Sequence, residues 1–174
     1  RRCTHAADPS ARPLAIARLD GWRWLICERG YANVFPPPSL RVSDEDLILE
    51  SEDSTREEEM EQGVYGVLYE MHPADEFLLD GFEGVDHRAP LSISKKVPMD
   101  MRPREQGVGS YNKWYVQAKV TKWLDTPPAG EDGQEVRVLL YVDEVNVCDD
   151  SPKKEYIARM NRGIREAEEF GLPR

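Results

Sequence analysis

The chain has 174 residues, is 40% hydrophobic and carries a formal net charge of −10, which suits one domain with a core of its own. No apolar run approaches the roughly 18 residues that a membrane span needs. No basic stripe offers a footprint for phosphate groups, so we expect neither a membrane nor a nucleic-acid partner.

The cysteines and histidines give no sign of a structural framework. Cys3, Cys27 and Cys148 lie far apart, and the three histidines are scattered, which fits neither a disulfide pattern nor a zinc spacing. The chain does not open with the charged-then-apolar pattern of a secretory signal. We therefore expect reduced thiols, a cytoplasmic location, and no metal or other cofactor.

Residues 14–35 predict three short strands. Apolar side chains alternate over 14–19 and again over 22–26, which predicts two strands joined as a hairpin at Asp20 and Gly21. The segment "YANVF" predicts a third strand, which ends at three consecutive prolines.

Residues 41–62 hold most of the negative charge. They contain ten acidic and two basic residues, and so account for −8 of the net charge of −10. We expect an acidic, flexible insertion within a single domain that spans 1–174, although such a run could also bind a basic partner.

The segment that follows predicts a strand and a helix. "GVYGVLYEM" (63–71) is largely apolar on both faces, which favours a central, buried strand. "HPADEFLLDGF" (72–82) has Pro73 at a helix start and acids in its first turn. The helix is expected to end at Gly81, which leaves Glu83 just beyond it.

The remaining elements complete an α+β pattern. "LSISKKVPM" (91–99) predicts a strand, and 102–112 a polar loop. Residues 113–124 and 136–145 both alternate and flank a turn-rich segment, which predicts an antiparallel hairpin.

The last segment (151–170) predicts a helix with Ser151 as N-cap, Pro152 at the first position and an apolar stripe. Gly171 is expected to end it. Together these elements predict a mostly antiparallel sheet that curls toward a barrel, with a few helices attached.

Few residues suggest chemistry by themselves. The sequence contains no nucleophile elbow, no Cys/His signature and no glycine-rich phosphate loop. Glu83 stands between Phe82 and Gly84, where tight packing would raise its pKa above the usual value of about 4.3. A carboxylate tuned in this way can take up a proton and return it. The alternative is a surface glutamate, or a carboxylate that caps backbone amides.

Tyrosines and one compact turn are further candidates. Tyr141 falls in a predicted strand and Tyr156 at the start of the last helix. The alternative is that both are ordinary half-buried tyrosines whose hydroxyls reach solvent. Gly30, Tyr31 and Asn33 form the entry to a predicted strand; the alternative is that they only shape a turn.

Three segments, in this order, resemble the γ-glutamylcyclotransferase family. "RRCTHAADPSARPLAIARLDGWRWLICERGYANVFPP" is similar to the early part of fungal members. "YGVLYEM" followed by "DEFLLDGFEGV" resembles a strand, a short helix and a Glu-Gly-Val turn. "LLYVDEVNVCDDSPKKEYIARMNRGIREAEEFGLP" resembles the closing strand and helix. The resemblance covers most of the chain outside the acidic insertion and the loop at 102–112.

The resemblance implies a γ-glutamylcyclotransferase-like fold and an enzyme of glutathione metabolism without a cofactor. The enzyme would be a monomer or homodimer that converts a small γ-glutamyl compound into 5-oxoproline and an amine or amino acid. It implies that Glu83 is the catalytic acid and base. It implies further that the substrate pocket is formed by Gly30, Tyr31, Asn33, Tyr141 and Tyr156.

The chain departs from the family pattern in two places. A Tyr-Gly-Ser-Asn loop, whose amides hold the substrate carboxylate in the family, would lie upstream of Arg1 and is absent, so we expect a truncated chain. Ala89 and Pro90 stand where many members have a tyrosine. These departures leave the substrate and the activity of this chain open. A binding module without catalysis, for a small acidic metabolite or a protein, is the alternative.

Overall fold

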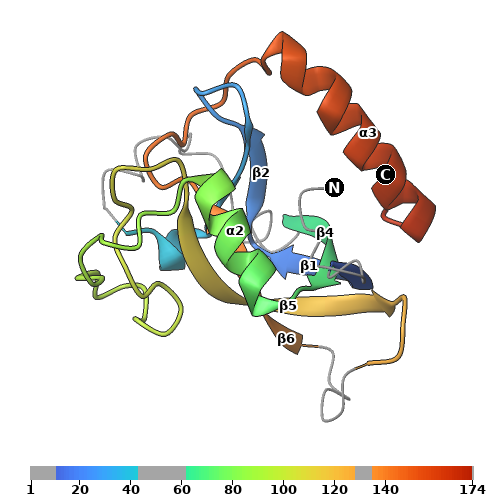
Figure 1. Cartoon of the computed structure of the whole chain (residues 1–174), viewed down its shortest axis with the longest axis horizontal. Helices are drawn as coiled ribbons and strands as arrows, with labels where there is room; N and C mark the ends of the chain where they lie inside the picture. Colours follow the sequence, from blue (N-terminus) through green and yellow to red (C-terminus); the bar gives the residue numbers. More distant parts are fainter. Residues whose placement is uncertain (1–10, 43–61, 128–134, 174) are drawn as a thin grey trace.

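The computed structural model describes residues 11–42, 62–127 and 135–173, and within them it is an α+β arrangement (Figure 1). A four-stranded sheet has the order β4-β1-β5-β6, and a two-stranded sheet pairs β2 with β3. The elements are β1 (Arg12–Asp20), β2 (Arg23–Ile26), β3 (Ala32–Phe35), the 3₁₀ turn η1 (Pro38–Leu40), β4 (Gly63–Glu70), α2 (Pro73–Glu83), β5 (Asn112–Trp123), β6 (Glu135–Val142) and α3 (Lys154–Phe170).

All pairings between these strands are antiparallel. Arg18 of β1 lies opposite Tyr65 of β4 on one side and Lys119 of β5 on the other. β5 and β6 form the predicted hairpin, with Val116 opposite Val138. Among the described residues the sheet is open, with β4 and β6 at its edges. Its inward side chains make the core: Ala15, Ala17, Leu19, Trp114, Val116, Ala118, Val120, Val136 and Val142, with Trp22 and Val97.

The hairpin predicted between the first two strands does not form. Gly21 does make the turn, with a φ of +76° that favours glycine. β2 nevertheless leaves the sheet and pairs with β3, because β1 already has β4 on one edge and β5 on the other.

The strand at 63–71 is an edge strand, not the central one. Tyr65 and Tyr69 of β4 are 38% and 50% exposed. Apolar side chains on both faces of the strand predicted that it would be buried. In the structure the aromatic side chains of β4 are instead exposed to solvent at the edge of the sheet. The strand predicted at 91–99 is also wrong, since Leu91 forms only a single bridge with Arg104 and Ile93 is exposed.

The last helix ends at the predicted Gly171, but the prediction that the first helix ends at Gly81 is wrong. Glu83 is the last residue of α2, and Gly84, with a φ of +70°, forms its left-handed cap. α3 begins at Lys154, two residues later than the predicted Pro152, because the Lys153 amide donates to the carbonyl of Gly30 (3.1 Å) instead of entering a helical turn.

α3 lies at the margin of the molecule (Figure 1), where it contacts β4 and accepts a hydrogen bond from Lys122 of β5 at its last residue. None of its residues is buried, and Ile157 and Ile164 of the predicted apolar stripe are exposed. No helix in the described ranges is long and apolar enough to cross a membrane. The predicted acidic insertion lies outside the described residues, except for its first two residues and its last.

Candidate active site

A cavity of about 790 Å³ brings together residues from five parts of the chain. They are the end of α2, the turn between β2 and β3, the residues just before β5, the end of β6 and the first half of α3. Four of the six predicted site residues line it: Tyr31, Glu83, Tyr141 and Tyr156. The other lining residues are Arg29, Ala32, Phe82, Ser110, Tyr111, Leu140, Arg159 and Arg162.

Glu83 is half-buried at the end of α2, and its position is fixed by close backbone packing. A Cβ on Gly109 would lie 1.9 Å from the carbonyl oxygen of Gly84, and a Cβ on Gly84 would lie 3.1 Å from the amide of Ser110. The residues before β5 therefore lie directly against the turn after Glu83. Glycine is required at both positions of this contact.

A carboxylate in the turn after Glu83 strengthens this contact. Asp86 accepts hydrogen bonds from the amides of Arg88 (2.9 Å) and Val108 (3.2 Å). These two bonds lower the pKa of the Asp86 carboxyl.

Replacing Asp86 with asparagine is expected to destabilise the fold in a pH-dependent way. Because the folded pKa lies below the unfolded value of about 3.9, the charge stabilises the fold above that pH and the benefit is lost as the pH falls through the folded pKa. Urea midpoints of wild type and Asp86→Asn should therefore differ by a constant amount above about pH 5 and converge near pH 3. Asp100→Asn is the exposed control. A difference that widens toward low pH would contradict this account.

Asp80, one turn before Glu83, anchors Tyr141. Its side chain is 3% exposed and accepts hydrogen bonds from the Tyr141 hydroxyl (2.7 Å) and the Lys113 ammonium (3.0 Å). Burial first, and then the bond to Asp80, raise the pKa of Tyr141 well above its usual range; the nearby charge of Glu83 adds to the rise. Burial lowers the pKa of Lys113, but its bonds to Glu76 and Asp80 outweigh this and the pKa is raised overall.

Arg29, in the turn between β2 and β3, ties this turn to the residue after β6 and to the residues before β5. Its Nε donates to the fully buried Asp143 (2.7 Å), and its Nη2 donates to the carbonyl of Ser110 (3.2 Å). The guanidinium also lies 4.7 Å from the ring centre of Tyr111. Burial raises the pKa of Tyr111 to about 12 despite the opposing charge of Arg29, and Glu83 contributes to the rise. The charge of Glu83 thus contributes to the raised pKa of both Tyr111 and Tyr141, which line the same cavity.

The α3 wall is built from aromatic rings and cations. The rings of Tyr31 and Tyr156 meet edge to face, with centres 5.2 Å apart. Arg159 lies over the ring of Tyr156 (4.9 Å), and Lys153 lies over that of Tyr31 (4.6 Å). The Tyr31 hydroxyl donates to Glu155 (3.0 Å), so the start of α3 is held to the turn between β2 and β3.

The other two predicted site residues, Gly30 and Asn33, lie outside the cavity lining. Gly30 has a φ of +77°, and a Cβ there would lie 2.6 Å from Cγ of Lys153. The buried Asn33 amide donates to the carbonyls of Asp143 (2.9 Å) and Asn146 (3.2 Å) and accepts from the Asp143 amide (3.0 Å). Both residues hold neighbouring segments in place beneath the lining.

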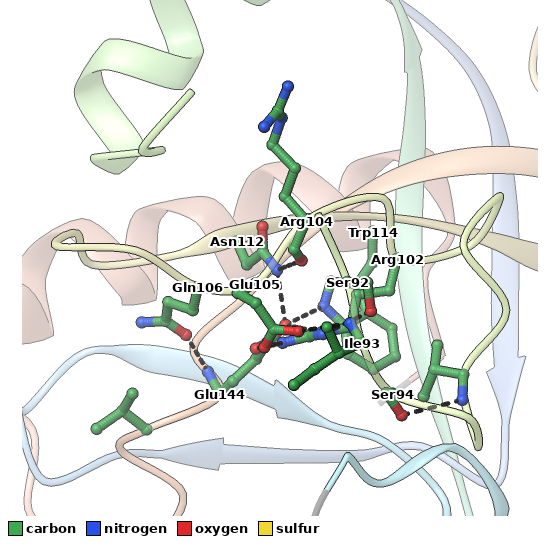
Figure 2. Close-up of polar contacts among 12 residues, drawn as sticks. Ser92, Ile93, Ser94, Arg102, Arg104, Glu105, Gln106, Asn112, Trp114 and Glu144 are labelled. Atoms are coloured by element: carbon green, nitrogen blue, oxygen red, sulfur yellow. Dashed lines mark hydrogen bonds and ion pairs between the residues drawn. The ribbon is translucent and has the colours of Figure 1, made fainter. Parts of the chain in front are cut away.

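A buried ionic cluster holds the loop that leads to Ser110 and Tyr111 (Figure 2). Arg102, 2% exposed, donates to Glu144 (2.7 Å), Glu105 (2.8 Å) and Ser92 (2.8 Å). Glu144 also accepts from the side chains of Trp114 (2.6 Å) and Asn112 (2.8 Å). The pKa of Glu105 is lowered chiefly by its bond to Arg102.

Sequence reasoning missed several residues of the site. Asp80 had a usable signal, because it precedes Glu83 by three positions and therefore shares its helix face. Arg29 adjoins the predicted Gly30–Tyr31 turn but was not singled out. Lys113 and Tyr111 had no local signal, since their roles depend on partners that are distant in sequence.

No protein-family model, curated protein or solved structure was found to match the chain. What the cavity does must therefore be argued from the chemistry of its own residues.

Proposed function

We propose that this protein is a γ-glutamylcyclotransferase-like lyase with Glu83 as its general acid and base, and that its sheet is part of the barrel-like fold of that family. The observation that carries the proposal is the place of Glu83, half-buried in a cavity of about 790 Å³ that Tyr141 also lines. A carboxylate so placed can exchange a proton with a bound ligand. The Glu-Gly-Val motif supports the same residue independently.

The reaction needs one proton carrier. The α-amino nitrogen of a γ-glutamyl group forms a bond to its own γ-carbonyl carbon, and the bond from that carbon to the leaving nitrogen breaks. Glu83 accepts the proton that the amine loses and delivers it to the leaving nitrogen. The products are 5-oxoproline and a free amine or amino acid, and Glu83 is regenerated. Because both reacting groups belong to one molecule, positioning supplies much of the rate.

The charge of the cavity suits a substrate with carboxylates. Arg29, Arg159 and Arg162 line it, although the chain as a whole is acidic. Arg29 is paired with the buried Asp143 (2.7 Å), whereas Arg162 has only a long, exposed ion pair with Glu166 (3.9 Å) and Arg159 lies over the ring of Tyr156, so the two arginines of α3 are the better placed to meet a ligand. A γ-glutamyl amino acid has one carboxylate on its glutamyl part and a second on its leaving part. We place the second against Arg159 and Arg162.

The test is 5-oxoproline release from a matched pair of substrates. γ-Glutamylalanine and γ-glutamylethylamine differ only in the carboxylate of the leaving group. We expect kcat/KM to favour γ-glutamylalanine about tenfold, the effect of one charge-assisted interaction of modest strength. The double variant Arg159→Gln/Arg162→Gln should remove this preference and leave turnover of γ-glutamylethylamine unchanged.

Arg165→Gln is the matched control, since Arg165 is on the same helix but does not line the cavity. If the double variant still prefers γ-glutamylalanine, the α3 arginines do not recognise the carboxylate of the leaving group. Absence of 5-oxoproline from either substrate would contradict the lyase proposal. The assay should use both the 174-residue chain and a form extended by any residues that its gene encodes upstream.

A binding module without catalysis is the second candidate, because the same arginines would hold an acidic metabolite without any proton transfer. Calorimetry separates the two: a module binds γ-glutamylalanine, yet the ligand is recovered intact after prolonged incubation.

A further inference from the structure

The hydrogen bond between Tyr141 and Asp80 fixes the direction in which Tyr141 can act. A tyrosine hydroxyl has one proton to donate, and an ionised carboxylate can only accept. Lys113 donates to one oxygen of Asp80 (3.0 Å) and Tyr141 to the other (2.7 Å). The proton of Tyr141 therefore points at Asp80. What Tyr141 presents to the cavity is an oxygen with lone pairs and no proton.

Two other oxygen-bearing side chains on this side of the cavity, those of Tyr111 and Glu83, have the same character. Tyr111 donates its proton to the carbonyl of Ala32 (2.8 Å). Glu83 in its ionised form is an acceptor. Arg159 and Arg162, on the α3 wall, can only donate. The cavity thus has an acceptor side, formed by α2, β6 and the residues before β5, and a donor side formed by α3.

We propose that Asp80 is a positioning residue: by holding the proton of Tyr141, it makes Tyr141 an obligate acceptor for the α-amino group of the substrate and so places that amine beside Glu83. The proposal rests on the lyase function proposed above. It explains why a buried carboxylate with a lysine partner lies one turn from the candidate catalytic residue. It also assigns the two ends of the substrate, with the amine at the acceptor side and the carboxylate of the leaving group at α3.

The variant Asp80→Asn tests this directly. Lys113 and His87 lie against the same oxygen of Asp80 (3.0 and 3.3 Å), and Lys113 can only donate, so the asparagine oxygen faces them and its NH₂ group faces Tyr141. Tyr141 then accepts from the asparagine, and its own proton turns toward the cavity, where it opposes an amine. We expect kcat/KM for γ-glutamylalanine to fall about tenfold, with the loss mainly in KM.

Two ligands distinguish positioning of the amine from a general loss of structure. N-Glutarylalanine has the shape of γ-glutamylalanine but lacks the α-amino group. In a Glu83→Gln background, in which turnover is slow, calorimetry should show that Asp80→Asn weakens binding of γ-glutamylalanine about tenfold and leaves binding of N-glutarylalanine unchanged. Asp75→Asn is the matched control, because Asp75 is equally buried on the same helix and does not line the cavity.

Tyr141→Phe completes the test. It should give the same selective loss, and Asp80→Asn should add nothing in its presence, because Asp80 acts through the hydroxyl. If Asp80→Asn fails to fold, as judged by circular dichroism, Tyr141→Phe alone decides the matter. Equal weakening of both ligands, or of neither, would overturn the inference. An inactive wild type would instead count against the lyase function, so the two failures are distinguishable.

Discussion

Replacing Glu83 with glutamine is expected to lower 5-oxoproline release from γ-glutamylalanine by a factor of about 10² to 10⁴, the usual contribution of general acid–base catalysis. Glutamine has the size and shape of glutamate but cannot carry the proton between the two nitrogens. Because Glu83 is at the end of α2, its replacement leaves the core of the sheet untouched. The loss should therefore appear in kcat, while KM and the unfolding temperature stay near the wild-type values.

Glu169→Gln provides the control for this experiment, since Glu169 is an exposed residue of α3 outside the cavity lining. Single-turnover measurements would show whether the chemical step is the one that is slowed. A glutamine variant that retains the full rate would show that Glu83 is not the proton carrier.

Replacing Arg102 with methionine is expected to lower the free energy of unfolding by about 3–5 kcal/mol, because it leaves buried carboxylates without their counter-charge. Within the described part of the chain, Arg102 is the cation that pairs with Glu144, whose side chain is itself only 7% exposed. Urea unfolding measures the change. Arg88→Met, on the exposed part of the same loop, should be close to neutral.

A second substitution separates loss of charge balance from loss of packing. In Arg102→Met/Glu144→Gln the buried charge is removed, while the glutamine oxygen can still accept from Trp114 and Asn112. We expect this double variant to recover part of the lost stability. If it is less stable than Arg102→Met, the cluster contributes through packing, not through charge.

Sequence patterns predicted the parts of the fold that depend on neighbours along the chain. The hairpin of β5 and β6 followed from alternation and a turn, the start of α2 from Pro73 and the end of α3 from Gly171, whereas α2 continues past the predicted Gly81 to Glu83. Strand order was not predictable in this way. Alternation shows which side chains share a face, but it does not show which strand lies beside which, so β4 was expected at the centre and lies at an edge.

The same limit applies to the site. Tyr31, Glu83, Tyr141 and Tyr156 were named from sequence, and the cavity brings them together. The cluster around Arg102 joins residues up to 42 positions apart, and no local pattern marks such partners.

The way α3 is attached affects how this protein could change over evolution or by design. The helix is held at its start by the amide of Lys153 on Gly30 and at its end by Lys122 on the carbonyl of Phe170, and none of its own residues is buried. Side chains on its cavity face can therefore be exchanged without opening the core. Selectivity for the ligand is thereby separable from stability, and α3 is the natural place for a library that seeks new substrates while Glu83, Asp80 and Tyr141 remain fixed.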